Sequence, residues 1–462
     1  MRTRTMVLGL LMTCPVFGQA KLPPYTKQAL GNGATLILLR KPDVPLISVR
    51  AMFRGGAEAE PEGQAGIAGL TAELIRRGTA QRTADQISLE MDSLGATVGG
   101  GSDRQASYLY TEFMARTQAP ALQVFADLLV NASFPEGEVK KALAQAVDAA
   151  KSAKDNPGMA IGRYFNAFYY GAAHPYGRVA DEETLGRLNR EQIVGFHKKM
   201  YVGRNLMLIA AGDFDPAKLG PQLAALAGQL PAGGAFQPGK VAAPGFETAR
   251  LLLVDKPDAT QTYFRIGMPG IARTNPDRVA LMIVNTLFGG RFTSMLNDEL
   301  RVNAGLTYGA NCMLEQDRLT GAISINTYTR TETTEKAMDM ALAVLKRLRE
   351  KGLDAEQLAS AKAYIKGGYP TQRLETADQL AGLIGELEIF DLSKAEVDDL
   401  FAKIDSITVA QANAVARKYY TEERLQFCLV GNAGKMQDAV KKYAAKMKVH
   451  PVKSPGFAAP AF

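Results

Sequence analysis

Apolar residues between positions 66 and 79 recur at the spacing of an amphipathic helix. Four residues of the string GIAGLTAELIRRGT occupy positions i, i+3, i+4 and i+7, namely Ile67, Leu70, Thr71 and Leu74. This spacing predicts a helix with one packed face. The other side carries Gly69, Ala72 and Glu73. Because a glycine inside a helix costs about 1 kcal/mol relative to alanine, this nearly bare face needs a reason.

Strand and helix patterns alternate in both halves of the chain. Residues 46–56 and residues 261–270 each read as an apolar strand that runs into a glycine and is followed by a helix. Residues 107–115 alternate like a half-buried strand, and Thr83 with Gln86 has the spacing of a capping box. Three further helices are expected at residues 118–131, 136–154 and 158–170. We therefore expect an α+β fold in which helices pack on one side of a mainly antiparallel sheet.

The pattern of the chain repeats once. Tyr201 and Gly212 are 11 residues apart, as are Tyr420 and Gly431, and the offset between the two pairs is 219 residues. A repeat of this length predicts two duplicated domains rather than a solenoid. The Pro-, Gly- and Ala-rich segment between them has the composition of a linker. The expected organisation is a leader over 1–20, an N-terminal domain over 21–229, a linker over 230–248, a C-terminal domain over 249–450 and a tail over 451–462.

The N-terminus has the pattern of a secretory signal peptide. Arg2 and Arg4 precede a short apolar run, and Gly18 and Ala20 stand at the spacing of a cleavage site. We expect cleavage after Ala20 and a periplasmic protein. Lipidation at Cys14 is an alternative that fits less well. The run is too short to cross a bilayer, and no later stretch has the length and composition of a transmembrane helix.

Composition excludes several classes of function. An apolar fraction of 47% and a charged fraction of 22% are typical of a globular protein. The net charge of +7 is spread along the chain without a Lys/Arg block interleaved with aromatics, so no nucleic-acid partner is expected. Gly234, Gly239 and Lys240 match part of a phosphate-binding loop. Val241 follows where Ser or Thr is needed, and the context is the linker, so a nucleotide site is rejected.

Residues that could carry metal or nucleophilic chemistry are few. The three histidines, His174, His197 and His450, lie far apart in the sequence, and no Cys-x-x-Cys occurs. The chain therefore offers no local set of zinc ligands, and each histidine is expected to pack or to cap a turn. Cys312 and Cys428 lie in strand-like runs, which favours two buried thiols, although a disulfide stays open in an oxidising compartment.

These features together resemble the M16 family of zinc metallopeptidases, which includes insulysin, pitrilysin and the mitochondrial processing peptidase. The resemblance rests on the duplicated halves, the helix over 66–79 after a strand and glycine turn, the HPYG loop at 174–177, and the strand that ends in GDFD at 212–215. It extends from about residue 25 to residue 450.

The resemblance implies that residues 66–79 correspond to the family's zinc helix, in which two histidines bind the metal and a glutamate acts as general base. The two histidine positions fall on Gly69 and Glu73, and the glutamate position falls on Ala72. The third ligand, a glutamate, falls on Ala149, beside Asp148. We therefore expect that this chain binds no zinc and has no peptidase activity alone, and that Glu73 and Asp148 are solvated or ion-paired.

The second half retains what the first has lost. Residues 287–310 resemble the family's substrate-binding segment, where an arginine and a tyrosine bind the peptide backbone and stabilise the tetrahedral intermediate. This pair corresponds to Arg301 and Tyr308. Fixed donors of this kind contribute a large part of catalysis in acyl transfer.

The resemblance therefore implies a non-catalytic, substrate-binding subunit of a heterodimeric periplasmic zinc peptidase. It would supply Arg301 and Tyr308 to a zinc site held by a partner, a paralogue with an intact zinc motif, and its substrate would be a peptide. One alternative is a structural or peptide-holding protein with no role in catalysis. Another is an independent peptidase with an unrecognised metal site.

Overall fold

Two mixed six-stranded sheets form the frame of the protein, in a computed structural model that describes residues 20–462. The strands of the first half are β1 (Thr26–Ala29), β2 (Thr35–Arg40), β3 (Leu46–Arg54), β4 (Thr97–Ser102), β5 (Ala106–Met114) and β6 (Leu206–Gly212). Those of the second are β7 (Arg250–Asp255), β8 (Gln261–Pro269), β9 (Ala310–Leu314), β10 (Ala322–Arg330), β11 (Gln426–Gly431) and β12 (Lys446–Pro451). The strand orders are β1-β2-β6-β3-β5-β4 and β12-β7-β11-β8-β10-β9. Most neighbours are antiparallel, and β2–β6, β7–β11 and β7–β12 are parallel.

Helices follow the strands in both halves. The first half contains α1 (Ile67–Ile75), α2 (Ala84–Ser93), α3 (Gln118–Asn131), α4 (Glu136–Ser152), α5 (Pro157–Tyr170), α6 (Glu182–Gly186), α7 (Arg190–Met200) and α8 (Pro216–Gly228). The second contains α9 (Arg278–Asn285), α10 (Met295–Asn297), α11 (Thr334–Lys351), α12 (Ala355–Arg373), α13 (Ala377–Ile389), α14 (Ala395–Asp398), α15 (Leu400–Ser406), α16 (Val409–Tyr419) and α17 (Ala433–Val440). The expected α+β fold with two similar halves is confirmed, and so is the capping box of Thr83 and Gln86 at α2.

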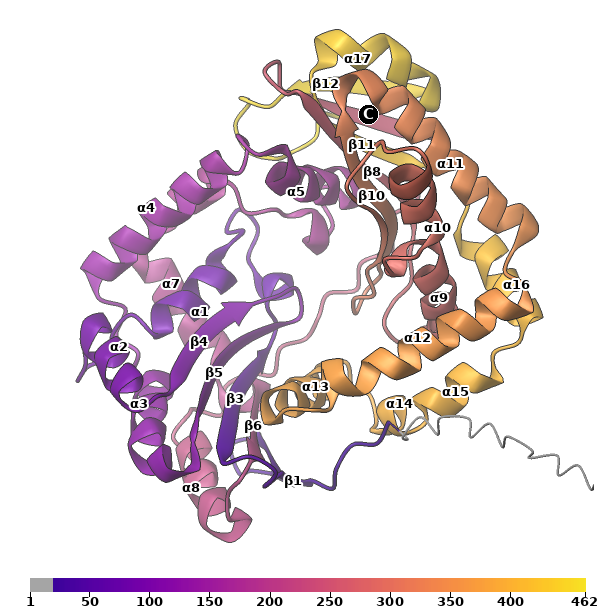
Figure 1. The fold of residues 1–462 in the computed structure, drawn as a ribbon. Helices are drawn as coiled ribbons and strands as arrows, with labels where there is room; N and C mark the ends of the chain where they lie inside the picture. Colours follow the sequence, from indigo (N-terminus) through magenta and orange to yellow (C-terminus); the bar gives the residue numbers. More distant parts are fainter. Residues whose placement is uncertain (1–19) are drawn as a thin grey trace, which may run out of the picture.

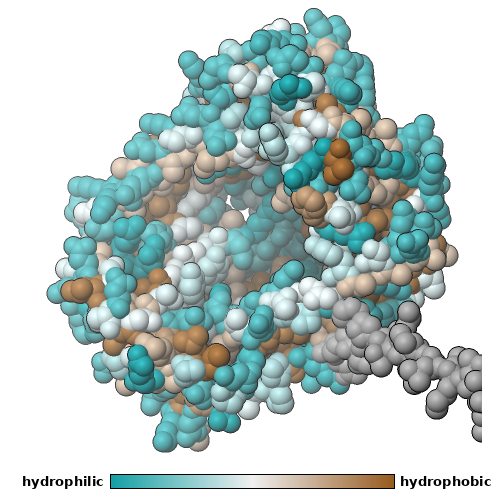
Figure 2. Space-filling model, viewed as in Figure 1, coloured by the Kyte–Doolittle hydropathy of each residue, from teal (hydrophilic) through white to brown (hydrophobic). Residues whose placement is uncertain are grey.

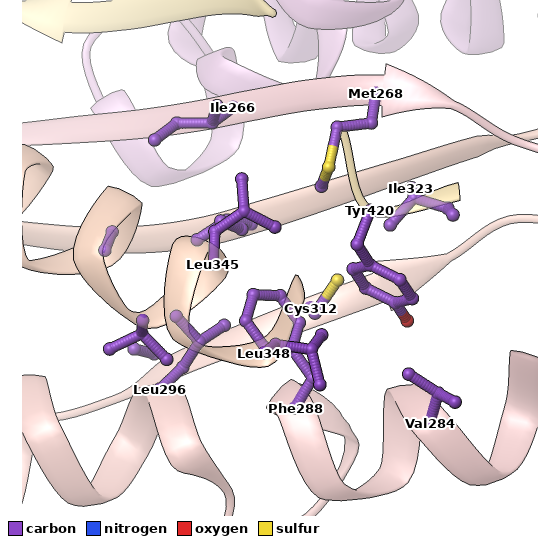
Figure 3. Close-up of a cluster of buried hydrophobic side chains, with 14 of the residues drawn as sticks. Ile266, Met268, Val284, Phe288, Leu296, Cys312, Ile323, Leu345, Leu348 and Tyr420 are labelled. Atoms are coloured by element: carbon purple, nitrogen blue, oxygen red, sulfur yellow. The ribbon is translucent and has the colours of Figure 1, made fainter. Parts of the chain in front are cut away.

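Each sheet buries one face against helices of its own half. Alternate β3 residues, including Ile47, Val49 and Phe53, pack into a core with α1, α3, α7 and α8. This follows from the period of two along a strand, which sends successive side chains to opposite faces. The second half builds the equivalent core on β8 and β10, with α9 and α11 against them. Figure 3 shows part of that core, where Cys312 lies among Phe288, Leu348 and Tyr420.

The other face of each sheet is covered by a helix from the opposite half. Helix α13 packs Leu380, Ile384 and Leu387 against β2 and β6 of the N-terminal sheet. Helix α5 packs Tyr164 and Phe165 against β7 and β11 of the C-terminal sheet. These helices begin at residues 157 and 377, close to the repeat offset, so they are equivalent elements exchanged between the halves. The sequence patterns did not predict this exchange.

Ion pairs also join the two halves. The guanidinium of Arg104 lies 2.9 Å from a carboxylate oxygen of Glu315 and also pairs with Asp317. Arg50 on β3 lies 2.6 Å from Asp378 on α13. Together with the exchanged helices, these contacts hold the halves as one body around a central hollow, which Figures 1 and 2 show.

The segments outside the two sheets differ in their packing. Residues 231–246 of the expected linker contain no helix or strand. The expected tail packs onto α5, with Val452 and Phe457 buried and the ring of Phe462 5.1 Å from that of Phe168. The predicted signal peptide and Cys14 lie outside the described residues, apart from Ala20, which is buried against the C-terminal core.

One helical stretch in residues 20–462, Arg278–Asn303, has the length and hydropathy of a membrane span. Of its most apolar window, 67% is buried inside the protein, which identifies a core helix.

Both cysteines of the mature chain are buried and free, as expected. Burial raises the pKa of the Cys312 and Cys428 thiols, because a thiolate loses its hydration in an apolar core. Neither thiol is therefore poised for nucleophilic chemistry.

Candidate functional site

Helix α1 forms where the sequence predicts it. Gly66 precedes it with a left-handed backbone, φ +97°, a conformation that glycine adopts at little cost. The buried Glu60 carboxylate accepts hydrogen bonds from the backbone N–H groups of Gly66 and Ala68, at 3.1 and 3.0 Å. These bonds satisfy donors that the first helical turn leaves free.

The face of α1 expected to be empty is empty of metal ligands. A Cβ atom added at Gly69 would meet nothing within 4 Å. Ala72 has no exposed surface, and a Cβ atom added at Gly100 of β4 would lie 2.5 Å from the Ala72 carbonyl oxygen. Strand β4 therefore lies directly against the helix at Ala72.

Glu73 is neutralised within its own helix turn. Its carboxylate lies 2.6 Å from the guanidinium of Arg76 and 2.7 Å from that of Arg77. The expectation that this glutamate is ion-paired is confirmed. Ala149 and Asp148 lie exposed on α4, so the residues at the four family positions supply no convergent ligand set.

This donor set does not fit zinc, which takes three or four N, S or carboxylate ligands in a site of its own. Within residues 20–462 no group of three His, Cys, Asp or Glu side chains could hold a metal ion. Of the residues on the α1 face, one carboxylate remains, and two guanidiniums already share it.

The three histidines pack or cap, as expected. His174 Nδ1 accepts a hydrogen bond from the backbone N–H of Tyr176 at 3.1 Å. His197 lies between the rings of Phe134 and Tyr201, and burial lowers its pKa to about 4. His450 on β12 lies against the ring of Tyr164.

We expect Gly69→Ala to stabilise the protein by about 0.5–1 kcal/mol, since alanine favours the helix and its methyl group has open space. The measurement is the free energy of unfolding in urea. Gly100→Ala is the matched control and should destabilise, because its Cβ would collide with the Ala72 backbone. A loss of stability in Gly69→Ala would show that something else requires the glycine.

We also expect Glu60 to make stability depend on pH. Burial raises its pKa from 4.5 to about 7, against the hydrogen bonds from Ala68 and Gly66, which favour the ionised form. A folded-state pKa above the unfolded value contributes stability below pH 4.5 that is lost as the pH rises through 7. Between about pH 5 and 7 this loss amounts to about 2 kcal/mol.

Urea unfolding at a series of pH values would measure this loss, and Glu60→Gln should flatten it. The exposed Glu62 supplies the control, because Glu62→Gln should leave the slope as in the wild type. An unchanged slope in Glu60→Gln would assign the pH dependence to other groups.

Arg301 and Tyr308 are brought together by the fold. Arg301 lies in the irregular helical turn Asp298–Asn303, and Tyr308 lies in the loop before β9. Both side chains line a cavity of about 490 Å³ between this loop and the ends of β8 and β10. Across the central hollow, β10 and α10 lie opposite α1 and α4 (Figure 1). The two residues that the sequence paired thus share one site.

Two threonines of β10 hold the loop in place. The Thr329 hydroxyl donates to the Leu306 carbonyl at 2.7 Å, and the Thr327 hydroxyl donates to the Gly309 carbonyl at 2.9 Å. The backbone around Tyr308 is therefore anchored on both sides. Its side chain is 81% exposed, so the phenol hydroxyl is fixed in position and open to a ligand.

Arg301 is held by an aromatic ring and keeps its charge free. Its guanidinium carbon lies 4.4 Å from the centre of the Phe292 ring, a distance at which cation–π attraction operates. Among the described residues no carboxylate lies within 4.0 Å of Arg301. The site therefore presents a positioned positive donor next to a neutral hydroxyl donor.

The structure adds residues that sequence reasoning missed. Arg330, Tyr328 and Gln261 line the same cavity. The signal for two of them was present, because Tyr328 and Arg330 lie two positions apart and so on one face of β10.

Comparisons with known proteins agree with this architecture. Residues 36–169 match the family model described as insulinase, peptidase family M16, and residues 187–365 match the model described as peptidase M16 inactive domain. An uncharacterized zinc protease of Mycobacterium tuberculosis is 25% identical, over 87% of this chain and 92% of that protein.

Solved structures show the same fold. A crystal structure described as peptidase M16 inactive domain from Pseudomonas fluorescens superposes with a TM-score of 0.82 at 23% identity, covering 88% of this chain and 98% of that one. A protease from Helicobacter pylori superposes with a TM-score of 0.81 at 18% identity, covering 89% and 100%.

Proposed function

The chain belongs to the M16 family of peptidases, the insulinase family, and from that premise we propose that it is the non-catalytic, substrate-binding subunit of a heterodimeric zinc peptidase. One observation carries the proposal, which is the contrast between the two halves. The α1 face offers a single neutralised carboxylate in place of metal ligands, whereas Arg301 and Tyr308 line an open cavity with their donors free.

In this role the chain binds and orients the peptide and stabilises developing charge. Arg301 offers a rigid fork of N–H donors and Tyr308 a neutral hydroxyl. Both would donate to a carbonyl oxygen of the peptide backbone as that oxygen gains negative charge, which is worth more than binding the substrate alone. The partner, a paralogue with an intact H-x-x-E-H motif, would supply zinc to polarise the carbonyl.

The test is reconstitution with such a paralogue. We expect the pair to co-purify, to contain one zinc per heterodimer and to hydrolyse peptides, while this chain alone contains no stoichiometric zinc and cleaves nothing. Stoichiometric zinc together with peptidase activity in the pure chain would overturn the proposal in favour of an independent peptidase.

A structural or peptide-holding protein is the second candidate. It is favoured by the loss of every histidine position on α1, which such a protein tolerates as well. It predicts that no paralogue with a zinc motif is recovered in a pull-down from periplasmic extract, and that peptide turnover in any complex is independent of Arg301.

We also propose a periplasmic location, supported by the signal-peptide pattern at the N-terminus. Mass spectrometry of the mature chain from a fractionated cell would check it. A chain that begins at Met1 and fractionates with the cytoplasm would contradict it.

A further inference from the structure

Arginines that line the space between the two halves are mostly paired with carboxylates. Arg50 pairs with Asp378, and Arg104 pairs with Glu315 and Asp317. Arg273, which lines the same cavity of about 610 Å³ as these two arginines, lies 3.0 Å from Glu386. Their charge is therefore used to hold the fold together.

Arg301 and Arg330 differ from these arginines. Among residues 20–462, neither has a carboxylate oxygen within 4.0 Å of its guanidinium. Both line the cavity of about 490 Å³ described above, and none of its lining residues is acidic. Two positive charges thus border one cavity without a counter-charge from the chain.

The remaining polar groups of this cavity are also donors. Tyr328 stacks on Tyr263 with ring centres 4.8 Å apart, which holds the Tyr328 ring in a fixed plane. Gln261 lies directly opposite Arg330 in the β8–β10 pairing. The tyrosine hydroxyls, the glutamine amide and two guanidinium forks together match a ligand with negatively charged acceptor oxygens.

We propose that this cavity binds a carboxylate of the peptide substrate, with Arg330 as the residue that sets the preference. This inference rests on the proposed function, in which Arg301 contacts the peptide backbone in the same cavity. The guanidinium of Arg330 supplies two parallel N–H donors that fit the two oxygens of a carboxylate. The carboxylate comes from an acidic side chain or from the peptide C-terminus.

The test compares matched short peptides on the reconstituted heterodimer. One peptide carries a glutamate and its counterpart a glutamine, each made with a C-terminal acid and with a C-terminal amide. For the wild type we expect kcat/KM to be about tenfold higher for the preferred carboxylate than for its amide counterpart. In Arg330→Gln this ratio should fall to about one.

The glutamate and C-terminal arms distinguish the two sources of the carboxylate. The control is Arg417→Gln, because Arg417 is exposed on α16 outside the cavity. It removes the same charge and should preserve both the rates and the ratio. Added salt should reduce the ratio in the wild type, since screening weakens an exposed charge contact.

Binding of the same peptides to this chain alone, read by fluorescence anisotropy, separates this inference from the proposed function. If Arg301→Ala does not slow the heterodimer, the proposed function fails, and the anisotropy ratio between carboxylate and amide peptides still decides the cavity. If the heterodimer depends on Arg301 but shows equal ratios in the wild type and in Arg330→Gln, the carboxylate inference is overturned while the proposed function stands.

Discussion

Replacing Arg301 by alanine in the reconstituted heterodimer is expected to lower kcat/KM by about 10²–10³-fold, the effect of removing one preorganised donor to a developing oxyanion. The loss should be mainly in kcat, because the donor acts most strongly when the carbonyl oxygen carries charge. The structure supports a large effect, since the guanidinium is held over Phe292 and has no competing carboxylate partner among the described residues.

Two further variants make this result specific. Tyr308→Phe removes a single neutral hydroxyl and should cost less than Arg301→Ala, because hydrogen bonds from charged donors are the stronger ones. Arg417→Ala removes an exposed arginine outside the cavity and should leave the kinetics unchanged. Steady-state kinetics of all three, with zinc content measured in parallel, would decide. A rate for Arg301→Ala within twofold of the wild type would refute the assigned role.

Separating the chain into residues 20–229 and 249–462 is expected to leave neither piece able to fold alone. Each piece would expose one face of its sheet and the apolar face of the helix that belongs on the other sheet. Exposed apolar surface of that size leads to aggregation. Co-expression should restore a soluble complex, because the two pieces then exchange α5 and α13. Solubility and circular dichroism of the separate and co-expressed pieces provide the measurement.

A point variant tests the same feature in the intact chain. Ile384 on α13 is 1% exposed against the N-terminal sheet. Ile384→Asp would bury an unpaired charge, which is among the most destabilising of substitutions. Hydrogen exchange should then increase in β3 and β6, although the substitution lies in the second half of the chain. Leu89→Asp, at a residue 73% exposed, is the matched control. Cooperative unfolding of either piece alone would contradict both predictions.

Much of the fold could be predicted because its signals are local. The period of 3.6 in α1, the alternation in β5 and the capping box at Thr83 act within a few residues. The repeat offset of 219 residues predicted two similar halves with the same strand order. The pairing of Arg301 with Tyr308 also followed, since seven residues of turn and loop separate them.

Other features depend on contacts between residues far apart in the chain. The burial of Ala72 follows from the approach of Gly100, and neither residue shows this in its own surroundings. Arg330 reads in the sequence as an ordinary charged strand end, and only its position beside Arg301 in one cavity identifies it as a binding candidate.

The sequence by itself determined the secondary structure, the duplication, the loss of metal ligands from α1 and the retention of Arg301 and Tyr308, because residue identity and spacing are sufficient for each. Only the tertiary structure decided which helix covers which sheet and which charges remain without a partner. The patterns of α5 and α13 state that each helix has an apolar face, yet both sheets offer a matching surface. The choice between them is made by packing and by pairs such as Arg50 with Asp378, 328 residues apart.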